Sequence, residues 1–329
     1  MRNTLANLFL LPLALQAQQP KHIAFNPTTF SNAFTLNRTP VLTISPGDTV
    51  STETIDAMGY DQKAVKRARG GNPLTGPFFI TGAAPGDIIA VHLLNVSLNR
   101  DYAKTTDYFA SRSMPKEIMK EFKTAPLVRW KLDLQTNQGW PDSSVYDYPH
   151  LKNFKVPLSP FLGCIGVAPA NRKNEILSFF QGPFGGNIDF NRARSGSTVY
   201  LPVFHEGAYL YIGDGHALQG DGEIAANALE TSMNVTFSVQ LIKNDTLQFP
   251  RVEDDEYLMA LGIEKETPDA IRLASKNLLD WLQKDYHLTL HEATQVMSTT
   301  IEYGIAEIAD PYVTIAAKIK KTRLRSLKN

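Results

Sequence analysis

The 329-residue sequence predicts an α+β protein with a mainly antiparallel β-sandwich body, jelly-roll-like, and helices appended at the C-terminal end. Three observations lead to this fold class. Short segments rich in β-branched and aromatic residues alternate with turns from residue 24 to about residue 250. Two pairs of such segments are joined through a Pro-Gly-Asp turn, at residues 46–48 and 85–87. Beyond residue 266, apolar residues recur at helical spacing.

The two Pro-Gly-Asp turns divide the first part of the chain into strands. Residues 41–44 and 49–52 flank the first turn, and residues 78–81 and 88–91 flank the second. Proline fixes φ and glycine accepts positive φ, so Pro-Gly is suited to the centre of a tight turn. We therefore expect two corners of one antiparallel assembly. Further strands are expected from the β-branched and aromatic residues at 198–203, 209–212 and 235–241.

The last eighty residues change from strand-like to helical patterns. Thr267 followed by Pro268 predicts the start of a first helix. Thr289 and Glu292 form a capping box that starts a second helix. The residues expected to carry that second helix are Val296, Thr300 and Tyr303. A closing strand is expected at residues 313–319. We assign residues 18–250 to a β-rich catalytic body and residues 251–329 to an α+β C-terminal part packed on the same body.

Composition excludes several classes of protein. The 33 basic and 33 acidic side chains cancel, whereas proteins that bind nucleic acids or anionic membranes depend on a basic excess. The single cysteine, Cys164, excludes an intrachain disulfide and any cysteine-rich metal site. Its apolar neighbours predict a buried structural thiol. We therefore expect a protein that acts on a small molecule and has no nucleic-acid partner.

The first seventeen residues have the pattern of a secretory signal peptide. Arg2 precedes a short apolar run at residues 8–15, and Ala17 offers a small residue at the cleavage point. The run is shorter than the roughly 20 apolar residues that span a bilayer. We expect residues 1–17 to be removed and the mature chain to be exported, periplasmic or secreted, without a membrane span.

Residues that offer chemistry gather in two glycine-rich segments, 182–189 and 213–223. Asp214 and His216 are two positions apart, so both side chains face the same side of an extended segment. An imidazole nitrogen and a carboxylate oxygen suit zinc or a similar divalent ion. Asp189 is the expected third ligand because it follows the first glycine turn. The alternative interpretation is that these glycine- and aspartate-rich residues are simply turns.

Two further carboxylates are candidates for proton transfer near such an ion. Glu223 or Glu230 would act as the general base, taking a proton from metal-bound water, with His216 also in the catalytic group. A bound metal lowers the pKa of its water to about 7, which gives a nucleophile at neutral pH. The expected cofactor is a divalent metal ion, zinc in the first place and calcium as the alternative.

The order of several motifs resembles that of the acetamidase/formamidase family. The matching blocks are residues 43–48 and 53–57, 72–77 and 82–87, 163–170, 182–189, 201–203, and 214–223 with Glu230. Together these blocks extend over most of the chain between residues 41 and 239. Members of this family hydrolyse small aliphatic amides to a carboxylic acid and ammonia, on a β-rich sandwich with added helices. The resemblance therefore implies a short amide as the substrate, and hydrogen bonds to that amide from Gly186, Asn187 and Gln219.

Two departures from the family pattern leave alternatives open. Phe184 stands where many members have histidine, and the C-terminal helical region, including Met297 and residues 302–304, diverges from the family. One alternative is a secreted binding module that keeps the amidase scaffold without turnover. Another is an amidase acting on a larger or cyclic amide, for which residues 99–158 would line a bigger pocket. A homodimer is expected because two-fold pairs are the commonest soluble assemblies.

Overall fold

Two large β-sheets form the framework of the computed structural model, which describes residues 19–327 except 125, 172 and 174. The predicted signal peptide at residues 1–17 lies outside these residues. Within them, the first sheet has nine strands, in the order β1 (His22–Ala24), β4 (Thr49–Glu53), β18 (Met233–Ile242), β6 (Ile88–Leu98), β15 (Thr198–Pro202), β19 (Arg251–Glu253), β20 (Tyr257–Glu264), β22 (Val313–Lys320) and β21 (Glu302–Glu307).

The second sheet has eleven strands among the described residues. Nine of them follow the order β10 (Val156–Pro157), β9 (Gln138–Pro141), β8 (Leu127–Asp133), β7 (Tyr102–Thr106), β17 (Glu230–Thr231), β16 (Leu210–His216), β11 (Phe161–Gly166), β14 (Gly185–Asn187) and β13 (Gln181–Gly182). Strand β5 (Leu74–Ile80) pairs with β16, and β3 (Leu42–Ile44) pairs with β5. Strands β2 (Ala33–Phe34) and β12 (Ile176–Leu177) form a separate small pair. The pairs β1–β4 and β3–β5 are parallel, and the other ladders are antiparallel.

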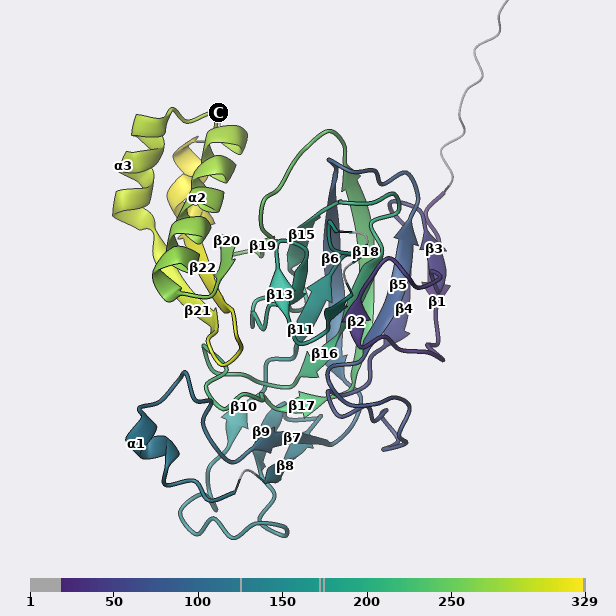
Figure 1. The fold of residues 1–329 in the computed structure, drawn as a ribbon, viewed down its shortest axis with the longest axis vertical. Coiled ribbons are helices and arrows are strands. Elements are labelled where there is room, and N and C mark those ends of the chain that lie inside the picture. Colours follow the sequence, from purple (N-terminus) through teal and green to yellow (C-terminus); the bar gives the residue numbers. More distant parts are fainter. Residues whose placement is uncertain (1–18, 125, 172, 174, 328–329) are drawn as a thin grey trace, which may run out of the picture.

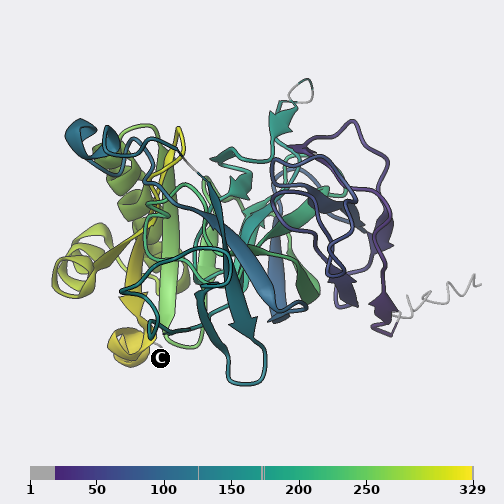
Figure 2. The ribbon, with the colours of Figure 1, turned by 90° about the horizontal axis from the view of Figure 1, so that it is seen from below.

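Helices are few and gather mainly at one side of the molecule. They are α1 (Lys116–Met119), α2 (Thr267–Asp285), α3 (Leu290–Thr300), α4 (Lys321–Leu324) and the 3₁₀ turn η1 (Arg325–Leu327). Figure 1 shows α2 and α3 beside β20–β22, with β7–β10 and α1 at another end of the molecule. In Figure 2 the helices and the N-terminal strands lie at opposite sides. The predicted β-rich α+β class is confirmed, and its jelly-roll-like detail stays a prediction.

One hydrophobic core joins the two sheets. Phe237 of β18 and Phe78 of β5 meet edge to face, with ring centroids 5.3 Å apart. Val91 of β6, Leu162 of β11 and Ile212 of β16 are fully buried in the same cluster. Burying a side chain of this size contributes roughly 1.5–3 kcal/mol each. This shared core fixes the eleven-stranded sheet, and the functional groups that it carries, against the nine-stranded sheet.

A second core joins the C-terminal part to the same framework. Helix α2 packs Ala274 and Leu278 against β20 and β22. At Gly262 of β20 a Cβ atom would lie 2.2 Å from the Ala274 backbone nitrogen, so only glycine permits this close approach of helix and strand. The nine-stranded sheet runs through β15, β19 and β20 to the hairpin β21–β22. The hairpin is thereby part of the nine-stranded sheet.

The C-terminal helices differ in detail from the sequence prediction. The capping box of Thr289 and Glu292 is confirmed. The N-cap position of the first helix is Glu266 rather than Thr267, and no side chain caps it there. Tyr303 is not on the second helix, because α3 ends at Thr300 and Tyr303 belongs to β21. The helix ends early because the β-branched residues before Ile301 disfavour helix, and Ile301 itself is extended. Beyond Ile301, pairing with β22 satisfies the backbone hydrogen bonds of β21.

Each Pro-Gly-Asp turn is a corner that carries the chain from one sheet to the other. The first turn connects β3 to β4, and the second connects β5 to β6. Gly47 and Gly86 have φ of +94° and +89°, values that favour glycine. The Asp87 carboxylate accepts hydrogen bonds from the backbone N–H of Ala84 (2.8 Å) and of Asn244 (3.0 Å). The aspartate therefore ties its own corner to the chain beyond β18.

Residues 99–158, the long excursion in the sequence, form β7–β10 and α1 and so extend the eleven-stranded sheet. In the part of the chain that the structure describes, no helix is long and apolar enough to cross a membrane.

The corner at Asp87 predicts a pH-dependent contribution to stability. Burial would raise the pKa of Asp87, but the hydrogen bonds from Lys243, Asn244 and Ala84 lower it below its usual value. A lowered folded-state pKa stabilises the fold above the unfolded value of about 3.9, and this contribution is lost as the pH falls through the folded pKa. We expect Asp87→Asn to reduce the free energy of unfolding at pH 7 by about 1–3 kcal/mol, as measured by urea denaturation.

The matched control is Asp255→Asn, at an exposed position, which should leave the free energy of unfolding nearly unchanged. The difference between wild type and Asp87→Asn should shrink as the pH is lowered below about 4. An equal difference at both pH values would contradict the role given to the carboxylate.

Candidate active site

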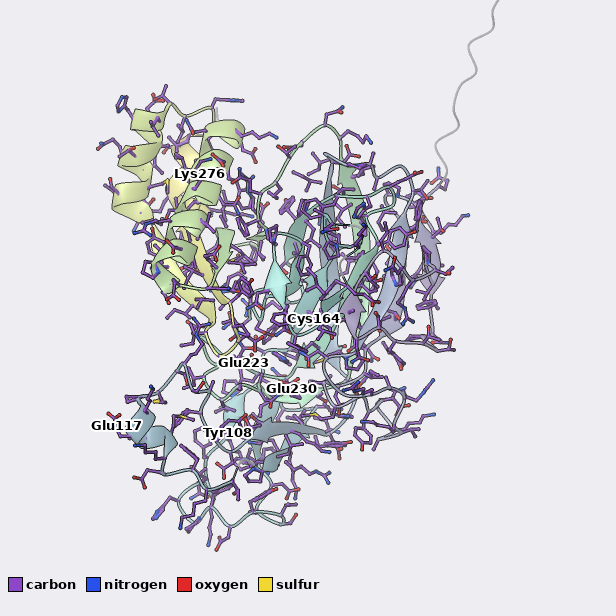
Figure 3. The ribbon with its side chains drawn as sticks, viewed as in Figure 1. Tyr108, Glu117, Cys164, Glu223, Glu230 and Lys276 are labelled. Atoms are coloured by element: carbon purple, nitrogen blue, oxygen red, sulfur yellow. The ribbon has the colours of Figure 1, made fainter. Side chains whose placement is uncertain are left out.

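Strands of the eleven-stranded sheet bring the predicted site residues together. Asp214 and His216 lie at the end of β16, and the ladder places Glu230 of β17 directly opposite His216. Asp189 follows β14, which is reached from β16 across β11. Glu223 comes from the turn that follows β16. Figure 3 shows Glu223 and Glu230 near the middle of the molecule, above the strands β7–β10.

These carboxylates are held in unusual backbone conformations. Asp189, Asp214 and Glu223 have φ of +43°, +56° and +47°. Residues other than glycine seldom adopt positive φ, and such strain clusters at functional sites. Three predicted site residues are therefore among the eleven described non-glycine residues with positive φ.

The tautomer of His216 follows from its contact with Gln219. The Gln219 Nε2 amide donates to the backbone carbonyls of Asp189 (2.8 Å) and Ala306 (3.1 Å), so its Oε1 faces the imidazole. That oxygen lies 2.9 Å from His216 Nδ1 and can only accept, which assigns the ring proton to Nδ1. In the neutral imidazole, His216 Nε2 is then left with the lone pair. It lies 3.3 Å from Glu230 Oε1 and 3.5 Å from Asp214 Oδ2.

Two groups of side chains have the spacing of cation ligands, and they share His216. One group is Asp214, His216 and Glu230, and the other is Asp189, His216 and Glu223. All members are buried, and the ligand atoms within each group lie within 4.8 Å of one another. In the first group His216 Nε2 faces both carboxylates, whereas its Nδ1 is already bound by Gln219. In the first group, the imidazole nitrogen that faces the carboxylates therefore has no hydrogen-bond partner to lose.

The residues present fit a divalent cation. Buried polar atoms without a hydrogen-bond partner include Asp189 Oδ1, Asp214 Oδ1, His216 Nε2 and Glu230 Oε2. Gly163 of β11 leaves room between them, because a Cβ there would lie 2.5 Å from Asp189 Oδ1 and 2.8 Å from Asp214 Oδ2. Buried polar groups are normally paired or bound to metal. A nitrogen and several carboxylate oxygens suit zinc and also harder divalent ions.

The pKa shifts of these residues also indicate a site for a cation. Burial raises the pKa of Asp189 and of Glu223 well above the usual values for carboxyl groups. Burial also raises the pKa of Glu230, to about 7, although His216 opposes the shift. For His216, burial lowers the pKa, but Glu230 and Asp214 raise it well above its usual value. A positive charge is therefore strongly favoured among these carboxylates.

Asn187 is the centre of a hydrogen-bond network beside the carboxylates. Its Nδ2 donates to Asp189 Oδ2 and to Asp310 Oδ2 (3.1 Å). Its Oδ1 accepts from Asn72 Nδ2 (3.0 Å) and from the Cys164 thiol (2.9 Å). Asn187 thus holds Asp189 in place, and the predicted contact of Asn187 with substrate stays a prediction.

The other two residues predicted to bind substrate have structural partners. Gly186 pairs with Ile165 and Gln181 in the sheet, and its φ of +98° favours glycine. Gln219 uses both ends of its amide on His216 and on backbone carbonyls, which makes it a positioning residue for the imidazole. Their contact with substrate also stays a prediction.

Cys164 is confirmed as a buried free thiol. Its burial, together with Asp214 and Asp189 nearby, raises its pKa well above the usual value. The thiol donates to Asn187 Oδ1 and to the Ser178 carbonyl (3.2 Å), so it supports the network.

Sequence reasoning missed three polar residues near the site. Asn72 donates to Asp214 Oδ2 (2.9 Å). Glu307, at the end of β21, is fully buried, and its Oε1 accepts from the Asp310 backbone N–H (2.7 Å). Burial and Glu307 raise the pKa of Asp310 to about 7. The available signal was a pair of acidic residues between two apolar strands, just before Pro311.

Phe184, the departure from the family pattern, belongs to the main core and to neither ligand group. Its ring packs 5.3 Å from that of Phe34 in the main core. It also lines a cavity of about 560 Å³ together with Gln181 and Tyr312. None of the residues that line this cavity belongs to either ligand group.

Two of the solved structures that share this fold are acetamidases. An acetamidase from Bacillus halodurans matches with a TM-score of 0.79 and 25% identity, over 93% of this chain and 100% of that chain. An acetamidase from Yersinia enterocolitica matches with a TM-score of 0.79 and 29% identity, over 95% of this chain and 94% of that chain.

Curated sequences agree with the structures. A formamidase from Methylophilus methylotrophus is 39% identical over 150 residues, which are 38% of this chain and 36% of that protein. The matches span 61% or less of the length of the curated relatives. The model of the acetamidase/formamidase family matches residues 17–177 and 183–268, which include every residue of the two ligand groups. The resemblance seen in the sequence is confirmed, and this chain belongs to the acetamidase/formamidase family.

Proposed function

We propose that this protein is an exported amidase, a hydrolase that cleaves the C–N bond of an amide to give a carboxylate and ammonia with the help of a divalent cation. The observation that carries the proposal is the buried group of Asp214, His216 and Glu230, in a chain of the acetamidase/formamidase family. His216 Nε2 lies close to both carboxylates, and each residue of the group has one buried atom without a hydrogen-bond partner: His216 Nε2, Asp214 Oδ1 and Glu230 Oε2.

Asp214 and His216 would hold the cation, as the sequence predicts, and the third ligand is Asp189 or Glu230. Glu230 is favoured by its contact with His216 Nε2, and Asp189 by its free Oδ1 above Gly163. When bound, a divalent ion polarises the amide carbonyl and lowers the pKa of water, zinc being the first expectation and calcium the alternative. Gln219 would orient the imidazole, since the residue behind a ligating histidine fixes its tautomer and direction.

Glu223 is the residue that we propose to move protons. Amide cleavage needs a proton delivered to the leaving nitrogen, which departs as ammonia. Burial, with Asp189 nearby, raises the pKa of Glu223 well above its usual value, so the group carries a proton at higher pH than an ordinary glutamate. Its Oε1 accepts from the Ala228 backbone N–H (2.9 Å), which also bonds to Glu230 Oε1 (3.0 Å). This shared donor keeps the two carboxyl groups side by side.

The alternative function, a binding module without turnover, rests on Phe184 and on the divergent C-terminal helices. Phe184 lies in the core, where its ring packs against that of Phe34, and it is not a member of either ligand group. The amidase is therefore the function that the geometry supports best.

Removing the metal should abolish amide hydrolysis. After dialysis against a strong chelator, we expect ammonia release from formamide, acetamide and propionamide to fall to background, and to return with added zinc or calcium. The ion that restores turnover, together with the metal content of the purified protein, identifies the cofactor. Full activity in a sample shown to be free of metal would exclude the cation from the mechanism.

Gln219→Leu should weaken the site by releasing the imidazole. The loss of an outer partner of a ligating histidine typically reduces metal affinity or activity by about 10- to 100-fold. Competition with a chromophoric chelator would measure zinc affinity, and ammonia release would measure kcat/KM. Gln240→Leu, at an exposed position on β18, is the matched control. Unchanged zinc affinity and turnover in Gln219→Leu would show that this glutamine does not set the orientation of His216.

Export and assembly remain proposals that one sample can test. We expect the native protein purified from its source to begin at Gln18, after removal of residues 1–17, and to be found outside the cytoplasm. Intact-mass and native-mass spectrometry would report the cleavage and the predicted homodimer. An unprocessed cytoplasmic chain, or a monomeric native mass, would contradict export or dimerisation respectively.

A further inference from the structure

An apolar cleft opens beside the candidate active site. Its volume is about 260 Å³, and residues 105–156 and 218–229 provide its walls. The largest apolar side chains that line it are Trp130, Phe154, Leu218 and Leu229. Trp130 and Phe154 meet edge to face, with ring centroids 6.1 Å apart. The long excursion between β6 and β11 thus builds one wall, and the chain between β16 and β17 builds the other.

Three residues connect the wall of the cleft to the carboxylate cluster. Gln219, Glu223 and Ala228 line it, and each also contacts the cluster. Glu223 and Gln219 are 8% and 7% exposed, whereas Asp189 is fully buried and His216 is 1% exposed. The most exposed members of the cluster are thus the ones that face the cleft. A molecule seated there would reach the proton-moving group first.

The lining selects for an apolar occupant. No lysine or arginine is among the described residues that line the cleft, and the hydroxyl of Thr105 is already bonded to the Asn227 carbonyl. Phe154 is 44% exposed and Ile224 is 39% exposed, so water covers apolar surface at this position when the cleft is empty. Filling the cleft with an apolar group removes that surface from water, which favours binding.

The size of the cleft exceeds the needs of the smallest amides. An apolar cavity of about 150 Å³ is enough to take a benzene ring. Formamide and acetamide, with at most one methyl group, would leave most of this cleft filled with water. An amide with a ring-sized acyl group would use its walls.

We propose that the preferred substrate is a primary amide with an apolar acyl group of about the size of a phenyl or benzyl group, seated between Trp130 and Leu229. This inference rests on the proposed amidase function and names its substrate class. In the reaction, water adds to the carbonyl carbon and the C–N bond breaks. The nitrogen takes up a proton and leaves as ammonia, and the acyl group leaves as the carboxylate.

Relative efficiency on paired substrates tests the proposal. For the metal-loaded protein we expect kcat/KM for phenylacetamide to exceed that for acetamide by at least about tenfold, mainly through a lower KM, because one or two buried methylene groups already discriminate by this factor. In Trp130→Ala the ratio of the two kcat/KM values should fall about tenfold. Trp140→Ala, in a neighbouring strand and outside the cleft, is the matched control, and its ratio should match wild type.

A second variant guards against loss of folding in Trp130→Ala. Phe154→Ala changes a partly exposed side chain and should lower the same ratio by a smaller factor. Thermal unfolding of each variant would confirm that it is folded. If acetamide is cleaved as efficiently as phenylacetamide and both cleft variants keep the wild-type ratio, the inference is wrong and the amidase function stands. If neither amide is cleaved by the folded, metal-loaded protein, the proposed function fails and the inference fails with it.

Discussion

The burial of several acidic side chains around one imidazole constrains the whole structure. Among the described residues, Asp189, Asp214, Glu223, Glu230 and Glu307 are all buried within this region. Ionised carboxylates cannot be removed from water unless a positive charge or hydrogen-bond donors compensate them. The single histidine cannot compensate all of them. The chain therefore supplies backbone and side-chain donors to some oxygens and leaves others free for a cation.

Rigid elements keep this arrangement from relaxing. The imidazole is fixed by Gln219, which in turn is fixed by carbonyl groups of two distant segments. Glycine at position 163 keeps the space between Asp189 and Asp214 open. The shared core of the two sheets holds β11 and β16 in register, so that strain at the positive-φ residues is not released. Packing far from the chemistry thus maintains the geometry of the polar groups.

Much of this could be predicted from the sequence where the signals are local. The Pro-Gly-Asp corners and the capping box at Thr289 depend on a few adjacent residues, and both are present. Asp214 and His216 could be paired because strand geometry places residues two apart on one side. Glu307 could not be found in this way, because its place beside the cluster follows from sheet pairing across β20, β22 and β21. The role of Gln219 in orienting His216 depends on the tautomer of the imidazole, which no sequence pattern encodes.

The turn of the hairpin β21–β22 contacts residues that are synthesised much earlier in the chain. Asp310, in its turn, bonds to Asn187, and Arg112 donates to the carbonyls of Asp310 and Pro311 (both 2.7 Å). Arg112 precedes Asp310 by 198 residues and Pro311 by 199 residues. Arg112 therefore leaves the ribosome long before its two partners. A nascent chain therefore contains Asp214 and His216 without the segment that completes their surroundings. The hydrogen-bond network beside these two residues is therefore complete only after residues 310–311 have been synthesised.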